Sequence, residues 1–396
     1  MNTPLVPATN SVSQYRLLVV DDNEMNRDML SRRLLNLGFY VDEAENGQQA
    51  LKSILVQSYD LVLLDIMMSV MDGYELLRQL MSNPLLCHIP VIMITAADDT
   101  ESVVRCIEMG AEDHLPKPFN LTILRARVDA ALAKKRLRDQ EQIHAKSLER
   151  ELEIGSNIQR SFLPKSLPLI VGWDLAAKFQ PARQVAGDFY DAFELPDGRL
   201  ALVVADVCDK GVGAALFMAL IRSLLRVVSK QNCTDADPDA VLVKTLEGIN
   251  DYIAQTHREA NMFATIFFAV LTPSTGDLLY VNAGHDPPIL MEPFFPIPSR
   301  LQPNGPAVGL MAGVKYKTQL VVMKTGSLLI AFTDGVTDAS GIDAQMFGEN
   351  RLLALLDCDC NCSAAAALDK IESALALHVG HCPRFDDITL LALRCE

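Results

Sequence analysis

Five short apolar runs that alternate with amphipathic stretches constrain the first third of this chain more than any other feature of its sequence. The runs are "RLLVV", "YVDEA", "LVLLD", "VIMIT" and "HLPKPF", and helix-like segments begin near Glu24, Gln48, Tyr74 and Glu101. Strands interleaved with helices in this way predict an α/β fold with a doubly wound, parallel five-stranded sheet.

Polar residues stand where these strands end. Asp21 and Asp22 follow the first run, and Asp65, Thr95 and Lys117 mark the ends of the third, fourth and fifth. Functional groups of such a sheet gather at the carboxyl ends of its strands, and converging carboxylates there favour Mg²⁺. Lys and Thr supply donors for phosphoryl oxygens, so one aspartate is predicted to accept phosphate. The alternative, in which these aspartates only cap a helix or open a turn, explains fewer of the five positions.

Residues 15–133 resemble the receiver domain of a two-component response regulator in these residues and in the "LPKP" motif. The resemblance implies these roles: Asp65 as phospho-acceptor, Asp21, Asp22, Asp65 and the Met67 carbonyl as Mg²⁺ ligands, Thr95 as the hydroxyl that follows the phosphoryl group, and Lys117 as its counter-ion. It also implies a cis bond before Pro118, and a sensor histidine kinase or phosphotransfer protein as phosphoryl donor. His114 stands where the family's switch residue is usually Tyr or Phe, which predicts a weaker or pH-sensitive switch.

Residues 1–14 are expected to form a disordered polar tail, and residues 134–165 a helical linker, as one helix or as two joined near Gly155. One heptad face of the linker mixes apolar and polar residues: Leu137, Glu141, His144, Leu148, Glu151, Gly155, Ile158 and Phe162. Because this coiled-coil pattern is interrupted, two interpretations stay open: a homodimer formed through the linker, and a solvated helix packed on its neighbouring domain.

Residues 166–396 change character. Short apolar runs such as "RLALVVADV", "FATIFFAVL" and "SLLIAFTDG" recur with turn signals such as "PDG" and "STGD" between them, and helical stretches lie near 214–229 and 238–256. Hairpin-connected strands with segregated helices predict an α+β domain, an antiparallel β-sandwich flanked by helices.

Four acids in this part stand at strand ends or beside glycine turns: Asp188, Asp206, Asp334 and Asp386. Isolated buried carboxylates are costly, so these side chains are expected to be paired or to bind metal. Oxygen ligands favour Mg²⁺ or Mn²⁺ over Zn²⁺. Two such ions bridged by one carboxylate lower the pKa of a water for attack on phosphorus.

Six spaced motifs of this part resemble the protein phosphatase 2C superfamily and, within it, the SpoIIE-like branch, which dephosphorylates serine or threonine on anti-sigma-factor antagonists. They are "IQRSFLP", "VAGDFYD", "ADVCDKGVGAALFMAL", "NAGHDPP", "FTDGVTDA" and "FDDITLLAL". The resemblance implies these roles: Asp206 bridging two Mg²⁺ or Mn²⁺ ions, Asp334 and Asp386 completing one site, Asp188 and the Val207 carbonyl holding the other, and Arg183 contacting the substrate phosphate. Asp209 replaces a usual glycine and adds a negative charge near the metals.

Several other residues have plainer interpretations. We expect His285 to brace a loop, Asp387 to hydrogen-bond a strand end, and Phe189 and Tyr190 to pack in the core. The cysteines of "CDCNC", Cys358 to Cys362, are expected to lie in a loop before a helix capped by Ser363.

The formal charge of −15 argues against nucleic-acid binding, because a phosphate backbone needs a positive face. Nine scattered cysteines fit reduced thiols, and neither a signal peptide nor an apolar stretch of roughly 20 residues is apparent, which predicts a cytoplasmic protein without a membrane partner. We therefore predict a response regulator whose output is metal-dependent dephosphorylation of phosphoserine or phosphothreonine on an anti-sigma-factor antagonist. The alternative is a non-catalytic, phosphorylation-gated module that sequesters its partner; the intact acid set favours catalysis.

Overall fold

The computed structural model describes residues 15–96, 100–118, 120–233, 238–293, 297–356, 362–382 and 384–396. The expected tail and the first four residues of "CDCNC" lie outside the described residues. The chain divides into two compact units between Leu148 and Glu149.

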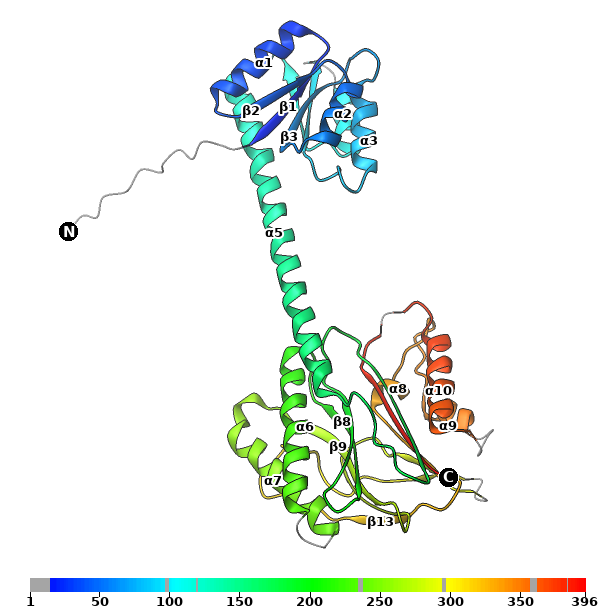
Figure 1. Cartoon of the computed structure of the whole chain (residues 1–396). Helices are drawn as coiled ribbons and strands as arrows, with labels where there is room; N and C mark the ends of the chain where they lie inside the picture. Colours follow the sequence, from blue (N-terminus) through cyan, green and yellow to red (C-terminus); the bar gives the residue numbers. More distant parts are fainter. Residues whose placement is uncertain are drawn as a thin grey trace, which may run out of the picture. The chain divides into compact units, whose positions relative to one another are not determined.

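The first unit is a five-stranded parallel sheet in the order β2-β1-β3-β4-β5, with helices on both faces (Figure 1). Its elements are β1 (Arg16–Val20), α1 (Glu24–Asn36), β2 (Tyr40–Ala44), α2 (Gly47–Val56), β3 (Leu61–Asp65), α3 (Gly73–Ser82), β4 (Val91–Ala96), α4 (Thr100–Glu108) and β5 (Asp113–Lys117). Alternate residues of β1 enter different cores: Leu18 packs in one cluster, and Leu17 and Val19 in the other. The predicted doubly wound α/β fold is confirmed.

Short polar residues begin the helices that follow the strands. The side chains of Asn23, Asn46 and Asp72 accept hydrogen bonds from the backbone N–H groups of Asn26, Gln49 and Glu75. Each bond satisfies a donor that the first helical turn leaves free. These caps fix where the chain turns from strand to helix beside the carboxyl ends of the strands.

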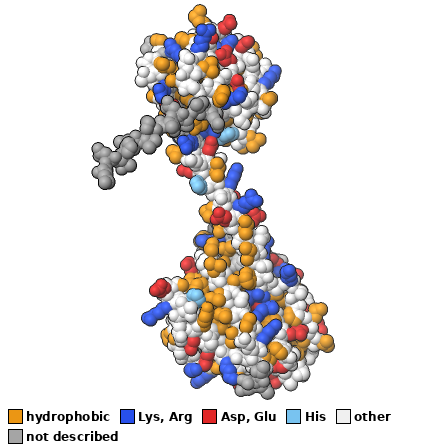
Figure 2. Space-filling model, turned by 60° about the vertical axis from the view of Figure 1, so that its left-hand side comes forward, with side chains coloured by type: hydrophobic (Ala, Val, Ile, Leu, Met, Phe, Trp, Pro, Cys, Tyr) orange, Lys and Arg blue, Asp and Glu red, His pale blue; other side chains and the backbone are white. Residues whose placement is uncertain are grey.

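A single helix, α5 (Leu121–Phe162), follows β5 and runs without a break for 42 residues, so the linker is one helix and Gly155 does not divide it. Its first turns bury Leu124 and Val128 in the core of the first unit. Leu137 and Leu148 of α5 are exposed. Figure 2 shows exposed hydrophobic side chains among charged ones on the surface.

The second unit is a sandwich of two five-stranded antiparallel sheets, in the orders β13-β10-β9-β8-β7 and β12-β11-β14-β15-β6. The strands are β6 (Trp173–Gln180), β7 (Phe189–Glu194), β8 (Leu200–Val207), β9 (Ala264–Thr272), β10 (Asp277–Ala283), β11 (Ile289–Met291), β12 (Ser299–Arg300), β13 (Gln319–Val322), β14 (Leu328–Phe332) and β15 (Ile388–Cys395). The core between the sheets joins Leu202 of β8 and Phe267 of β9 to Leu329 of β14 and Leu391 of β15.

Helices cover both outer faces of this sandwich (Figure 1). They are α6 (Val212–Asn232) and α7 (Pro238–Thr256) on one sheet, α9 (Glu349–Leu356) and α10 (Ala364–Val379) on the other, and the short α8 (Asp334–Thr337). The predicted α+β sandwich is confirmed.

Helix α6 is long and apolar enough to cross a membrane, by length and composition alone. The expectation that the chain has no such stretch was therefore wrong. One face of the helix nevertheless packs on the sheet, because Ala214, Met218, Ile221 and Leu225 are buried in the same core as β8 and β9. That packing is what a core helix of a sandwich requires.

Candidate functional site

Three carboxylates meet at the carboxyl ends of β1 and β3. One ligand atom each from Asp21, Asp22 and Asp65 lies within 4.8 Å of the others. Lys117 at the end of β5 places Nζ 2.9 Å from Asp65 Oδ1 and 3.1 Å from Asp21 Oδ2. The parallel topology thus brings together residues that are up to 96 positions apart in sequence.

Burial and charge set the protonation of this cluster. Burial raises the pKa of Asp65, and the hydrogen bond and charge of Lys117 partly offset this effect. Burial lowers the pKa of Lys117, but its hydrogen bonds and charge pairs with Asp65 and Asp21 outweigh burial and leave the pKa raised. An acidic cluster with one lysine still carries excess negative charge, and its oxygen donors fit Mg²⁺.

Thr95 lies at the end of β4, 2 % exposed, and its Oγ1 has no hydrogen-bond partner within the described ranges. Because a buried hydroxyl without a partner is unfavourable, this group fits a site that receives an additional acceptor such as a phosphoryl oxygen. His114 is partly buried with Nδ1 3.7 Å from Asp113, and the bond between Lys117 and Pro118 is cis, as predicted. The side chain of Met67 is 79 % exposed. Its backbone carbonyl is the part of this residue that was expected to bind Mg²⁺.

A second group of acids converges in the sandwich. Asp206 lies near the end of β8, Asp188 directly precedes β7, Asp334 begins α8, and Asp386 stands two residues before β15. Asp188 is 2 % exposed, and its Oδ2 accepts a hydrogen bond of 3.1 Å from Thr389 Oγ1.

The charges of this group influence one another. Burial raises the pKa of Asp188 well above its ordinary value, and the charge of Asp206 raises it further. Burial raises the pKa of Asp206 to about 7; a hydrogen bond with Asp188 opposes this, while the charges of Asp334 and Asp386 add to it. The pKa of Asp334 is raised to about 6 by burial and then by Asp386. A cation among these carboxylates would relieve their repulsion and stabilise their charged forms, so the donor set fits Mg²⁺ or Mn²⁺.

Lys210 already places one positive charge at this group. Its Nζ lies 2.6 Å from Asp386 Oδ2 and 2.7 Å from the Phe385 carbonyl oxygen. The sequence interpretation did not single out Lys210, although it lies four residues after Asp206 in the quoted "ADVCDKG" motif. Asp209 is exposed and adopts a φ of 71°, a conformation that explains why glycine suits this position.

The loop that carries Asp188 is held from two sides. Asp387 accepts hydrogen bonds from the N–H groups of Ala182 (2.7 Å) and Gly187 (3.0 Å). From α5, the buried Gln159 donates to the Ala186 carbonyl (2.5 Å) and accepts from the Ala186 N–H (3.0 Å). Asp387 was expected to hydrogen-bond a strand end, but its side chain instead bonds to the loop between β6 and β7.

The loop before Asp188 packs closely against its neighbours at Gly187. A Cβ on Gly187 would lie 2.9 Å from the Val207 carbonyl oxygen, so only glycine allows this approach. On the same helix Ile158 is 56 % exposed, and the neighbouring Gln159 is the buried residue. The sequence feature that could have pointed to Gln159 is its position in the "IQRSFLP" motif.

Some conspicuous residues stay outside the acid group. Asp191 is 1 % exposed and forms an ion pair with Arg226 from α6 (2.6 Å), with Arg222 Nε 3.1 Å away. His285 is 2 % exposed and braces a loop through Thr265 Oγ1 at 2.9 Å, as expected, and burial lowers its pKa to about 4. Arg183 is exposed in the loop before Asp188.

Phe189 is buried in the core, and the half-buried Tyr190 packs between the sheets, so both aromatic residues are core residues as expected. Ser363 caps α10, because its Oγ accepts from the Ala366 N–H at 3.1 Å. These residues support the fold around the acids and carry none of their charge.

Comparisons with known proteins agree with both units. Residues 17–129 match the response regulator receiver domain family, and residues 196–396 match the Stage II sporulation protein E (SpoIIE) family. Protein IcfG of Synechocystis is 43 % identical over 262 residues, which are 61 % of this chain and 41 % of IcfG. The probable transcriptional regulator ycf27 of Cyanidium caldarium is 40 % identical over 119 residues, 30 % of this chain and 47 % of that protein.

This chain therefore spans about two fifths of IcfG and about half of ycf27. Among solved structures, the SiaA-PP2C domain of Pseudomonas aeruginosa is 22 % identical with a TM-score of 0.53, and the match covers 64 % of this chain and 98 % of that one. At that identity the likeness concerns the fold, a phosphatase 2C-like sandwich. With its family match over half of its length, the chain belongs to the SpoIIE family and carries an N-terminal response regulator receiver domain.

Proposed function

We propose that this chain is a response regulator whose output is metal-dependent dephosphorylation of phosphoserine or phosphothreonine on a protein. One observation carries the proposal: Asp188, Asp206, Asp334 and Asp386 gather in the sandwich, and burial and the repulsion between neighbouring carboxylates raise the pKa values of Asp188, Asp206 and Asp334. Buried carboxylates that repel one another destabilise a fold unless bound cations offset their charge. The acid group is therefore best explained as a cation-binding site.

In the sandwich, Asp206 would bridge two Mg²⁺ or Mn²⁺ ions, Asp334 and Asp386 would complete one site, and Asp188 with the Val207 carbonyl the other. Bound ions of this kind lower the pKa of a water for attack on phosphorus. The protein orients the ligands: Thr389 donates to Asp188, and Asp387 holds the backbone of the loop. Arg183, exposed in that loop, would contact the substrate phosphate.

In the receiver, Asp65 would accept the phosphoryl group from a sensor histidine kinase or a phosphotransfer protein, with Asp21, Asp22 and the Met67 carbonyl holding Mg²⁺. Thr95 Oγ1, which has no hydrogen-bond partner among the residues the structure covers, would donate to a phosphoryl oxygen, and Lys117 would balance its charge. His114 would act as the switch residue of this unit.

The substrate that we infer is a phosphorylated anti-sigma-factor antagonist in the cytoplasm, with no nucleic-acid or membrane partner. The resemblance of the motifs to the SpoIIE-like branch supports this choice. The exposed apolar residues of α5, among them Leu137 and Leu148, support a homodimer through residues 134–165. We further propose domain limits of 15–133 for the receiver and 166–396 for the phosphatase.

A non-catalytic binding module is the second candidate. It is less favoured because a protein that only sequesters its partner has no need of four carboxylates whose charges repel.

Replacing Asp206 with Asn tests the proposal. The change removes one charge and one bridging oxygen, so phosphate release from a phosphoserine peptide in Mn²⁺ should fall by about a hundredfold or more, with the fold intact. Asp277→Asn, the same change at the partly buried first residue of β10, is the matched control. Near wild-type turnover by Asp206→Asn would reject the metal assignment.

A further inference from the structure

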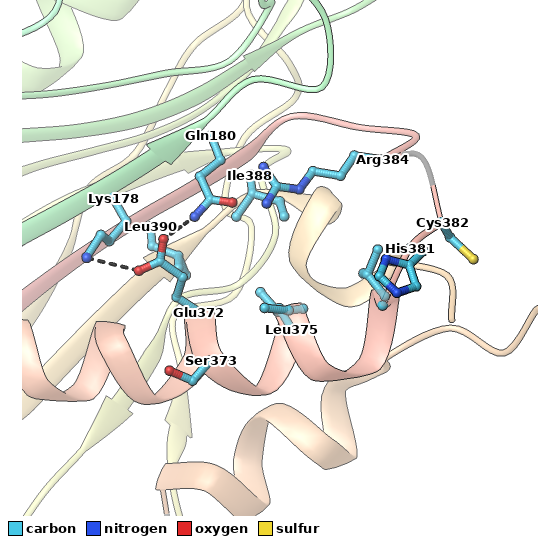
Figure 3. A pocket seen from close by; sticks show the side chains of 13 residues that line it. Lys178, Gln180, Glu372, Ser373, Leu375, His381, Cys382, Arg384, Ile388 and Leu390 are labelled. Atoms are coloured by element: carbon cyan, nitrogen blue, oxygen red, sulfur yellow. Dashed lines mark hydrogen bonds and ion pairs between the residues drawn. The ribbon is translucent and has the colours of Figure 1, made fainter. Parts of the chain in front are cut away.

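Two cavities beside Asp386 share part of their walls. The larger, about 560 Å³, lies between α10, β6 and β15 (Figure 3). The smaller, about 180 Å³, is lined by Asp386 itself and by Phe385. Val379, Arg384 and Ile388 line both cavities. The two cavities are therefore neighbours on either side of these residues; together they are called the α10 groove, and the smaller one reaches Asp386.

Most charges of the α10 groove are already paired. Lys178 lies 2.8 Å from Asp369 and 3.0 Å from Glu372, and Gln180 also bonds to Glu372 (Figure 3). Arg384 differs, because no acceptor pairs with its guanidinium anywhere in the described ranges. Figure 3 shows its side chain pointing from the loop after α10 toward Ile388. Arg384 is thus an unpaired cation that lines both cavities, whereas the carboxylates of Asp338 and Asp386 line the smaller cavity.

Apolar side chains form much of the larger cavity. Leu375, Val379, Ile388 and Leu390 belong to its walls, and Phe385, which lines the smaller cavity, is 72 % exposed. A volume of about 560 Å³ is in the range of specific binding pockets, which combine apolar walls with a few polar groups. The groove can therefore take several side chains together with one negative charge.

We propose that the α10 groove binds the polypeptide segment flanking the phosphorylated residue of the substrate, and that Arg384 contacts an acidic side chain there. The inference rests on the proposed phosphatase function and names its recognition surface. A substrate whose phosphate lies at Asp386 must run its chain away from the acid group, and extended chain advances about 3.3 Å per residue. Residues within a few positions of the phosphoserine therefore reach Arg384, and their charge decides how well they bind.

The experiment uses the full chain in Mn²⁺ and four phosphoserine peptides of equal length, with three Glu or three Lys residues on either side of the phosphoserine. On one side of the phosphoserine, we expect wild-type kcat/KM to be about tenfold higher for the Glu-flanked peptide than for the Lys-flanked peptide. Glu would form a charge pair with Arg384 at the rim of the groove, whereas Lys would be repelled by it. Arg384→Glu should abolish or invert this preference, and Arg384→Gln should reduce it.

Lys324→Glu is the matched control, because it makes the same charge change at the turn before β14. Gly326 in that turn bonds to Cys395, at the far end of β15 from Ile388. This variant should keep the wild-type preference. Fluorescence of Trp173, the only tryptophan, reports whether each variant folds.

The proposal is overturned if active Arg384→Glu and Arg384→Gln proteins keep the wild-type preference. It is equally overturned if both lose p-nitrophenyl phosphate hydrolysis as much as peptide hydrolysis, because Arg384 would then act at the metal group. A wild type that hydrolyses neither p-nitrophenyl phosphate nor any peptide would instead reject the phosphatase function and, with it, the docking groove.

Discussion

At the scale of single residues, the acids of the sandwich oppose folding when no cation is bound. Asp206 is partly buried with a pKa of about 7, and Asp334, whose charge acts on it, has a pKa of about 6. In an unfolded chain both groups titrate near 4. The metal-free fold is therefore most stable when these groups are protonated.

This linkage predicts the pH dependence of stability. A carboxyl group whose folded pKa is raised contributes stability below about pH 4 and loses it as pH rises to about 7, on the order of 3–4 kcal/mol for Asp206. In EDTA, the Trp173 unfolding midpoint should fall across this window, and less so in Asp206→Asn. Mn²⁺ should restore the wild type at pH 7.5 more than at pH 5, because its ligands must be deprotonated. Identical pH profiles for the two proteins would show that Asp206 is not buried as a charged group.

At the scale of elements, the strands of both units were foreseen because their apolar runs are long and bounded by turn residues. The two-residue β12, the three-residue β11 and the four-residue α8 were not, because such short segments have no measurable periodicity. Helix α9 lacked a clear start signal. For the acids, their types and strand-end positions could be predicted, since topology brings strand ends together.

The contacts that position the acids could not be foreseen in the same way. Gln159 and Lys210 are polar residues on an exposed-looking helix and turn, and only tertiary structure shows that Gln159 is buried against Ala186 and Lys210 faces Asp386. Their partners lie 27 and 176 residues away, beyond the reach of any local pattern.

Helix α5 therefore reaches the Asp188 loop through one side chain. Gln159→Ala would leave the buried N–H and C=O of Ala186 without partners, a cost of about 1–3 kcal/mol. We expect the loop to shift, with turnover reduced about tenfold and the apparent Mn²⁺ affinity weakened. Asn157→Ala, at an exposed position of the same helix, is the control. If Gln159→Ala changes only the unfolding midpoint and neither Mn²⁺ affinity nor turnover, Gln159 supports the fold alone.

At the scale of the whole molecule, one helix belongs to both units: α5 packs on the receiver sheet through Leu124 and Val128 and ends beside Ala186 through Gln159. Coupling between two sites requires that two states of the receiver differ in their contacts with such an element. We predict that phosphorylation of Asp65 changes phosphatase turnover, and that it raises it.

The most direct measurement is the rate of phosphate release from a radiolabelled phosphoserine peptide by the full chain, with and without acetyl phosphate, while intact mass follows phosphorylation. The wild type should accelerate roughly fivefold or more, the effect of a typical coupling energy. Asp65→Asn should be neither phosphorylated nor accelerated, and Asp28→Asn, at an exposed site on α1, should behave as wild type. An unchanged rate in wild-type protein that is fully phosphorylated at Asp65 would contradict a receiver-gated phosphatase.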